Sequence, residues 1–363
     1  MKQNFEKKSR NSNIELLRII SMIFIIISHY TVHNNYNLFG MPIGFNRYIL
    51  EVAILGNIGV WIYILITGYF MCESNKVKIS KLFKLYFQIL FYSLVIYMLF
   101  CLFGDENFSL KGLIKNMFPI TFKVYWFATA YAILYLLTPF LNKMIQNMTR
   151  KEHFKFNLMY LLIFSIIRTF TNQDFYCSQL VEFIFIYSIG AYLRLYPDNI
   201  FNRKANNKKI FIISTILLLS STLILDLLGL KIKILQGHSQ HFFNRHSILV
   251  IMFSISLFSI FINKKECTNK IINKLAGCTF GIYLIHDNPY IRKFLWIDLF
   301  KNAQYVNSKY MIIHLIFSVS IVYISCTIIE YIRQKIMTRF LKKLQKIDKP
   351  FENVIDKGFE ILK

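Results

Sequence analysis

The sequence predicts an all-α, polytopic integral membrane protein with about ten transmembrane helices. Of its 363 residues, 55% are hydrophobic, and the mean hydropathy of +0.43 is too apolar for a water-soluble protein of this size. The apolar residues gather in runs of roughly 17–25, the length that crosses a bilayer. Helices are the expected form, because an isolated span must satisfy its own backbone hydrogen bonds.

Ten spans can be placed along the chain, with edges uncertain by several residues. They are expected at about 13–32, 48–71, 82–103, 121–141, 154–171, 178–196, 210–230, 247–263, 276–296 and 309–332. The first run carries charges and is followed by no small-residue cleavage site, so it is expected to be a retained span and not a signal peptide.

The domain organisation follows from these spans. Residues 1–12 form a basic amino terminus, 13–333 a membrane domain and 334–363 a basic amphipathic tail. Such a tail is typical of a helix lying on anionic lipid. No extracytoplasmic globular domain is expected after the tenth span.

Loop charges predict the orientation. Every second loop is rich in Lys and Arg, as in 197–209 and 264–275, whereas 172–177 contains neither residue and 231–246 is a mild exception. Basic loops stay on the cytoplasmic side, so both termini are expected in the cytoplasm. The same loops account for the net charge of +24, and no basic surface interleaved with aromatics points to nucleic acid.

Three ionisable residues lie in the first span. Arg18 and His29 are eleven residues apart, which is three helical turns, so both project from one face, with Glu15 beside Arg18. Charges in a span usually face a protein interior or a water-filled cavity. By its depth in the span, Arg18 lies near the inner end of the helix. There it is either an anchor at the membrane surface or a ligand for phosphate. His29 lies near the outer end of the helix. There it is either a proton acceptor in a reaction or a side chain at the membrane interface beside Tyr30.

Other polar residues at span ends allow two interpretations each. Glu51 lies near the outer end of the second span, at a depth similar to that of His29, where it either orients the imidazole or stays solvated. Tyr125 and Trp126 either stack on a sugar ring or belong to the aromatic belt. His286 and Asp287, like Glu182, Asp226 and His314, are either site residues or hydrogen-bonded groups between helices. The outer-loop histidines fit no strong metal template, and the six cysteines have no CxxC spacing, so no metal site is predicted.

Five segments taken in order resemble the acyltransferase-3 family of integral-membrane O-acyltransferases. The first-span motif has an acidic residue, then Leu-Arg, then an apolar stretch ending in His. The second has Gly-x-x-Gly-Val before aromatics, and the last is Gly-x-Tyr-Leu-x-His. The segments read NIELLRIISMIFIIISHY, GNIGVWIYILITGYFM, YWFATAYAILYLLTPFLN, FFNRHSILVIMFSISLF and TFGIYLIHDN.

The resemblance implies transfer of an acyl group, most often acetyl from acetyl-CoA, to a surface glycan. His29 matches the family's essential histidine, and Arg18 matches an arginine thought to hold CoA phosphates. The segment KVKISKLFKLYF places Lys78, Lys81 and Lys84 where the family has an Arg-x-x-Arg-like motif. Lysine keeps the charge but loses the bidentate geometry. Some relatives end in a secreted esterase-like domain; none is expected here, which implies direct transfer to the acceptor.

The resulting hypothesis is a membrane O-acetyltransferase of the bacterial cell membrane. His29, roughly 22 Å from the cytoplasmic end of its helix, would act as general base with Glu51 as its partner, although an acyl-histidine relay stays open. Trp126, Tyr125, His286 and Asp287 would contact the glycan or lipid-linked acceptor. The rival interpretation is a glycan exporter or flippase with the same spans. The acceptor sugar and any homo-oligomeric state are left open.

Overall fold

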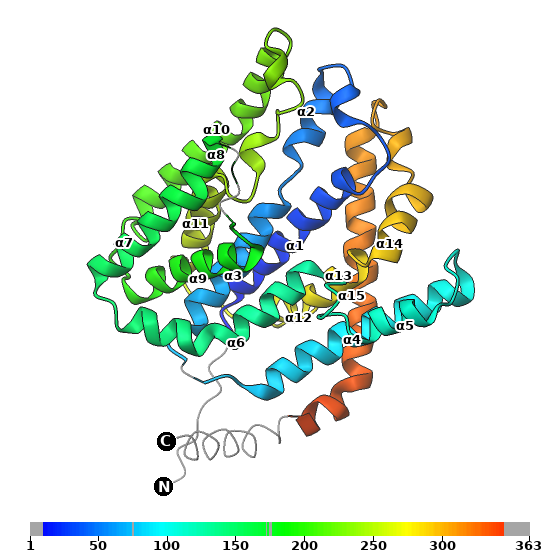
Figure 1. Cartoon of the computed structure of the whole chain (residues 1–363), viewed down its shortest axis with the longest axis horizontal. Coiled ribbons are helices and arrows are strands. Elements are labelled where there is room, and N and C mark those ends of the chain that lie inside the picture. Colours follow the sequence, from blue (N-terminus) through cyan, green and yellow to red (C-terminus); the bar gives the residue numbers. More distant parts are fainter. Residues whose placement is uncertain (1–9, 75, 172, 174–175, 345–363) are drawn as a thin grey trace.

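The computed structural model describes residues 10–344 except 75, 172, 174 and 175, and its regular elements are all helical. Figure 1 shows them as an inclined bundle, with α4, α5 and α15 along one side and α7 to α11 along the other. The helices are α1 (Ser12–Val32), α2 (Phe45–Val52), α3 (Gly56–Met71), α4 (Ile79–Phe103), α5 (Leu110–Met117), α6 (Trp126–Gln146), α7 (Arg150–Leu161), α8 (Arg168–Thr171), α9 (Gln179–Leu195), α10 (Lys204–Gly229), α11 (Ile248–Ile262), α12 (Lys270–Ala276), α13 (Thr279–His286), α14 (Pro289–Lys293) and α15 (Met311–Leu344).

Six helical stretches among the described residues are long and apolar enough to cross a membrane. They are Ser12–Val32, Phe45–Met71, Ile79–Phe103, Arg150–Thr171, Lys204–Gly229 and Met311–Met337. The prediction of an all-helical protein with several spans is therefore confirmed. The total of ten spans and the cytoplasmic position of both termini stay predictions. The ends of the predicted terminal segments, 1–9 and 345–363, lie outside the described residues.

The ninth predicted span is not one continuous helix, which corrects the sequence prediction. It contains α13 and α14 and runs into a π-helical turn at Phe294–Leu299, while α12 ends at Ala276, where the predicted span begins. Asn288 caps α14 by accepting a hydrogen bond from the Tyr290 amide at 3.0 Å, and Pro289 occupies the first helical position. Proline lacks an amide hydrogen and disfavours helical geometry in the residue before it. The chain therefore turns at Asp287 and Asn288.

The second and fifth predicted spans are also interrupted. Residues 53–55 separate α2 from α3, and a π-helical turn at Leu162–Ile167 joins α7 to α8. Pairing these short helices gives the long stretches Phe45–Met71 and Arg150–Thr171. The interruption before α3 is relevant to function, because its neighbour Asn57 borders the cavity described below.

Helix α3 lies at the centre of the bundle and crosses α1 and α9 closely. A Cβ built on Gly59 would lie 2.5 Å from the Ser21 carbonyl oxygen of α1, and one on Gly68 would overlap the Tyr187 backbone of α9. Small residues allow such contacts between membrane helices. The three helices form the framework on which α1 presents its polar face.

The start of α1 and the latter part of α15 lie at the same end of the bundle. The Ser12 amide donates to the Cys267 carbonyl at 2.8 Å, just before α12. The Gln334 side-chain amide of α15 donates to the Gly277 carbonyl at 2.9 Å, just after α12. This end contains the loop 264–275, which the charge pattern assigns to the cytoplasm.

Candidate active site

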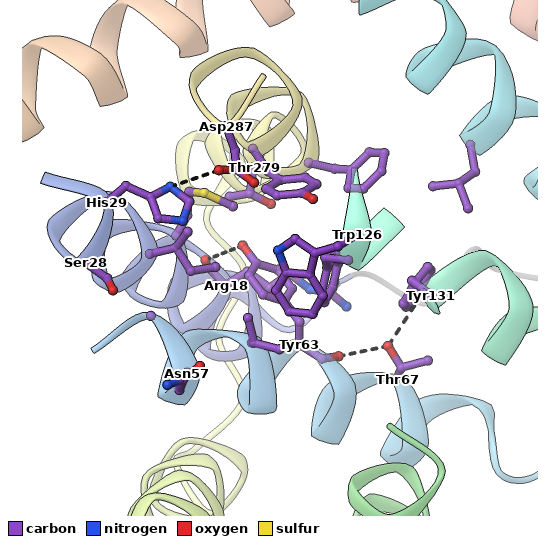
Figure 2. Close-up of a pocket in the computed structure, with 18 of the residues that line it drawn as sticks. Arg18, Ser28, His29, Asn57, Tyr63, Thr67, Trp126, Tyr131, Thr279 and Asp287 are labelled. Atoms are coloured by element: carbon purple, nitrogen blue, oxygen red, sulfur yellow. Dashed lines mark hydrogen bonds and ion pairs between the residues drawn. The ribbon is translucent and has the colours of Figure 1, made fainter. Parts of the chain in front are cut away.

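A cavity of about 640 Å³ runs beside α1 and contains both predicted first-span residues. It is bounded by α1, α3, α4, α6 and α13, and Figure 2 shows His29, Arg18, Tyr63 and Trp126 around it. Arg18 and His29 are separated by about 16 Å along the helix at 1.5 Å per residue. The helical spacing predicts that these two side chains share one face of α1, and in the structure that face borders the cavity.

One end of the cavity carries three cationic side chains. Arg18 comes from α1, and Lys81 and Lys84 come from the first turns of α4. Arg18 Nε lies 3.7 Å from the Glu15 carboxylate, the pairing expected from their spacing of three residues. The excess positive charge makes this end suitable for phosphate groups.

His29 borders the other end of the cavity, and the fully buried His286 lies directly behind it. His29 Nδ1 lies 3.0 Å from His286 Nε2, and His286 Nδ1 lies 2.6 Å from the Ile282 carbonyl oxygen. A carbonyl only accepts, so His286 carries its proton on Nδ1, and in the neutral ring Nε2 accepts from His29 Nδ1–H. This hydrogen-bond chain leaves the lone pair of His29 on Nε2.

Asp287 is the acidic residue next to His29. Its Oδ1 lies 3.5 Å from His29 Nδ1 and 3.4 Å from His33 Nε2, and it accepts a 2.8 Å hydrogen bond from Arg292 Nε. The carboxylate is almost fully buried. It can therefore orient the His29 ring and stabilise an imidazolium.

The end of α13 is held in place by its neighbours. Asp287 is the residue at which α13 ends, so the broken ninth span brings Asp287 to the cavity, with the buried His286 beside it. The next residue, Asn288, donates to the Tyr125 hydroxyl at 2.7 Å. Tyr125 is fully buried and does not border the cavity. It thus supports the turn that carries the acidic residue.

Aromatic side chains line much of the cavity. Tyr63, Phe127, Tyr131 and Tyr283 face it, and the Tyr63 hydroxyl donates to the Arg18 carbonyl oxygen at 2.8 Å. Trp126 also borders the cavity, with the guanidinium of Arg245 4.9 Å from its ring centre. The cavity is therefore polar at its two ends and lined by aromatic and aliphatic side chains between them.

Two further residues predicted for the site lie elsewhere. The Glu51 carboxylate accepts hydrogen bonds from Arg47 at 2.9 Å and from Ser239 at 2.9 Å, and Arg47 also pairs with Asp226 at 2.6 Å. The structure does not bring this buried group to His29. Lys78 does not border the cavity; its backbone amide donates to the Tyr135 hydroxyl at 3.2 Å at the start of α4.

Sequence reasoning missed two residues of this site. His33 follows His29 by four residues, so the two rings come together, with centroids 4.6 Å apart. That spacing is a recognisable signal for side chains on one helical face. Arg292 lies within the ninth predicted span, and a charge in a span is itself a signal.

Within the described part of the chain, one group of side chains is close enough together to hold a metal ion. One ligand atom each from His29, His33 and Asp287 lie within 4.8 Å of one another. However, His29 Nδ1 already has His286 as a partner, and Asp287 Oδ1 already accepts from Arg292. These hydrogen bonds occupy one ring nitrogen of His29 and one carboxylate oxygen of Asp287.

The long apolar helices define a multi-pass membrane protein with a cavity inside its helical bundle. A family model described as an acyltransferase domain matches residues 11–331. The chain therefore belongs to the acyltransferase-3 family and is a membrane acyltransferase, as the ordered motifs predict. Comparison with the curated proteins and with the solved structures gave no significant match.

Proposed function

We propose that this protein is an O-acetyltransferase that moves acetyl from cytoplasmic acetyl-CoA to a hydroxyl of a cell-surface or lipid-linked glycan. One observation carries the proposal: a single cavity joins the cationic end at Arg18, Lys81 and Lys84 to the His29–Asp287 end. A donor with a charged nucleotide and a long arm needs a cationic site for its phosphates at one end and a reactive group for its thioester at the other.

The cationic end suits the donor. Arg18 and the two lysines would hold the phosphates of CoA, which is a substrate and not a resident cofactor. The separation of about 16 Å along α1 then sets how far the pantetheine arm must extend to bring the thioester to His29. Because lysines provide charge without a fixed bidentate geometry, most of the geometric selection would fall to Arg18.

His29 would act as the general base. Its Nε2 lone pair would take the proton of the acceptor hydroxyl as the hydroxyl oxygen attacks the thioester carbonyl carbon. The carbon–sulfur bond then breaks, and the imidazolium returns the proton to the departing CoA thiolate. Asp287 would stabilise the imidazolium, the part first assigned to Glu51, while His286 keeps the required tautomer.

The acceptor would approach from the end opposite the cations. Trp126 borders this part of the cavity together with Asn57, and a tryptophan face is a common support for a sugar ring. With the orientation predicted from the loops, this end faces outward across the bacterial cell membrane. A glycan exporter with the same architecture is not favoured, because the family match and the histidine–aspartate cluster both support group transfer.

The proposal is tested by measuring acetyl transfer and CoA binding with purified protein and by mass spectrometry of surface glycan from cells. His29→Ala should reduce acetylation at least about a hundredfold, the range of general acid–base catalysis, while CoA binding persists. His238→Ala, which changes an exposed loop histidine, should leave transfer unchanged. Full acetylation by His29→Ala at equal protein level would disprove this mechanism.

A further inference from the structure

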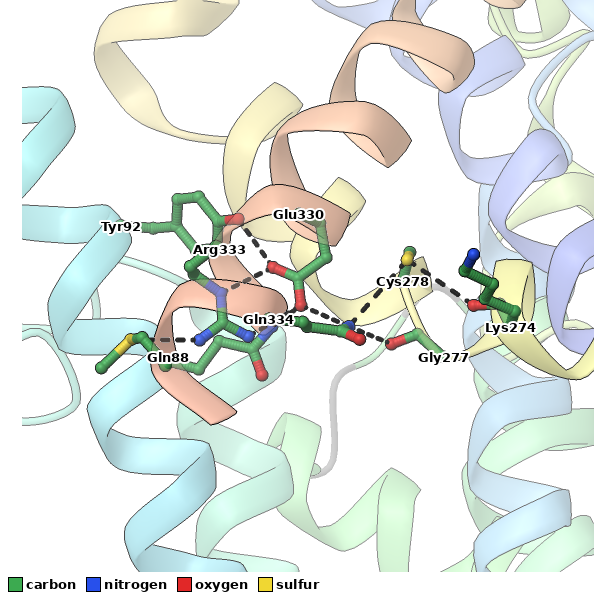
Figure 3. Close-up of polar contacts among 9 residues, drawn as sticks. Gln88, Tyr92, Lys274, Gly277, Cys278, Glu330, Arg333 and Gln334 are labelled. Carbon is green, nitrogen blue, oxygen red and sulfur yellow. Dashed lines mark hydrogen bonds and ion pairs between the residues drawn. The ribbon is translucent and has the colours of Figure 1, made fainter. Parts of the chain in front are cut away.

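A second buried charge cluster lies behind the cavity wall, and the proposed mechanism does not use it. It consists of Glu330, Arg333 and Gln334 of α15 with Gln88 and Tyr92 of α4 (Figure 3). Glu330 is completely buried, and Arg333 is 7% exposed. We call these five residues the Glu330 cluster.

The Glu330 carboxylate accepts hydrogen bonds on both oxygens. Oε2 accepts from the Tyr92 hydroxyl at 2.6 Å and from Arg333 Nε at 2.8 Å. Oε1 accepts from Arg333 at 2.7 Å, Gln334 at 2.7 Å and Gln88 at 3.2 Å. A carboxylate offers about four acceptor sites. Since these are filled by protein donors, the group is suited to holding helices together and not to binding a ligand.

Helix α13 packs directly against this carboxylate. A Cβ built on Gly281 would overlap the carboxylate carbon and Oε2 of Glu330. Gln334 donates in addition to the Gly277 carbonyl at 2.9 Å, in the break between α12 and α13. Helix α15 thus holds both the start of α13 and the irregular backbone before it. Such backbone within a membrane protein needs protein partners for its polar groups.

The opposite face of α13 forms the site. Thr279, Tyr283 and Asp287 recur at intervals of four residues and all border the cavity. Gly281 lies two residues from Thr279 and from Tyr283, about 200° around the helix. The Glu330 cluster therefore supports α13 from behind, while the cavity face presents Asp287 to His29.

The cluster reaches the donor end as well. Gln88 borders the cavity on α4 and follows Lys84 by four residues and Lys81 by seven, so the three side chains share one face. Its hydrogen bond to Glu330 joins the cationic wall of the cavity to the wall that carries Asp287. One carboxylate thus contacts both α4, which carries Lys81 and Lys84, and α13, which ends at Asp287.

We propose that Glu330 is a positioning residue: its carboxylate fixes α13 against α4 and α15 and thereby holds His286 and Asp287 in register with His29. This inference rests on the proposed function for its kinetic consequence. The anchoring of α13 is a separate physical property and is measured separately. A displacement of about 1 Å at a reacting group can reduce turnover about a hundredfold.

The first test is Glu330→Gln, which keeps the shape and removes the charge. We expect kcat for acetyl transfer to fall at least tenfold, with the Kd for CoA changed less than threefold. A purely structural defect would instead lower the yield of folded protein and weaken CoA binding together with kcat. A folded variant with kcat within twofold of wild type, or a parallel loss of binding and turnover, would overturn the proposal.

The second test disturbs the same contact from the side of α13, by adding a methyl group at Gly281 where it would overlap the Glu330 carboxylate. Gly281→Ala should displace the Glu330 carboxylate and lower kcat at least tenfold with CoA binding kept. Gly44→Ala is the matched control, because a Cβ there would have no neighbour closer than 4.0 Å. It should retain wild-type kcat. Equal turnover in the two alanine variants would contradict the assignment.

Hydrogen–deuterium exchange gives a readout that does not depend on catalysis. In Glu330→Gln and Gly281→Ala, amides of 279–287 should exchange at least tenfold faster than in wild type, while those of α9 should not change. If wild type neither binds CoA nor transfers acetyl but this difference appears, the proposed function fails and the anchoring stands. Unchanged exchange in 279–287 would overturn the anchoring.

Discussion

At the scale of single residues, the hydrogen bond between His29 and His286 decides which nitrogen of each ring carries a proton. His286 Nδ1 must donate to the Ile282 carbonyl, so its Nε2 accepts from His29. The arrangement leaves His29 Nε2 as the acceptor, and Asp287 lies where it stabilises the charged ring. These three side chains come from two helices that are more than 250 residues apart in sequence.

Replacing Asp287 by asparagine tests its electrostatic part. Asp287→Asn keeps the size of the side chain but removes the charge that would stabilise the His29 imidazolium. We expect kcat to fall at least about tenfold with little change in CoA affinity. Steady-state kinetics of acetyl transfer measures this, with Asp198→Asn as an exposed control in an Arg150 pair. Turnover within twofold of wild type would argue against the role of Asp287.

Arg18 is expected to govern donor affinity. Arg18→Ala should weaken CoA binding about tenfold or more, because it removes a charged donor from the phosphate end of the cavity. The wild-type affinity should also fall as salt rises, since partly exposed charges are screened. Calorimetry with CoA measures both effects, and Arg150→Ala is the control. Undiminished binding by Arg18→Ala would place the phosphates elsewhere.

At the scale of elements, the crossing of α3 with α9 depends on glycine. Gly68→Ala would push a methyl group into the Tyr187 backbone, and backbone cannot move aside as a flexible side chain can. We expect a loss of about 1–3 kcal/mol in stability. Thermal unfolding in detergent measures it, with Gly44→Ala as control, because a Cβ there has no neighbour closer than 4.0 Å. An equal Tm in both variants would refute the prediction.

At the scale of the whole molecule, the loop charges predict which side of the membrane each end of the cavity faces. In a cysteine-free background, Gln236→Cys should react with a membrane-impermeant thiol reagent in intact cells. Lys208→Cys, also exposed, should react only after permeabilisation. Gln236 lies in the loop 231–246, whose basic residues make it the exception to the charge pattern, so its labelling tests the predicted orientation at its weakest point. The reverse labelling pattern would invert the proposed direction of acetyl transfer.

Much of the fold was predictable because the apolar composition of a single segment is enough to predict a membrane helix. Each long apolar run contains helix in the structure, although some are interrupted, and the first span begins within one residue of its predicted position. The breaks were less accessible. Pro289 is a local signal for the end of α13, but the close packing of Gly281 on Glu330 depends on α15. Glu330 itself was overlooked, although a charge within a span is a sign of function or pairing.

The candidate site shows the same division. The pairing of Arg18 with Glu15 and the common face of Arg18 and His29 follow from helical spacing, which operates within one segment. The choice between Glu51 and Asp287 as the acid beside His29 does not. The depth predicted for Glu51 is similar to that of His29, but depth does not say where around the bundle a helix packs. In the structure Glu51 turns to Arg47, and Asp287 faces His29.

The sequence alone determined the membrane class, the helical content, the family and the two polar positions on α1. These properties depend on composition, on periodicity and on motifs that lie within single spans. Only the tertiary structure decided that the two positions face one cavity, that the broken ninth span carries the acid to His29, and that α15 supports it from behind. Such contacts join distant segments, and their formation depends on how helices pack, which no local pattern encodes.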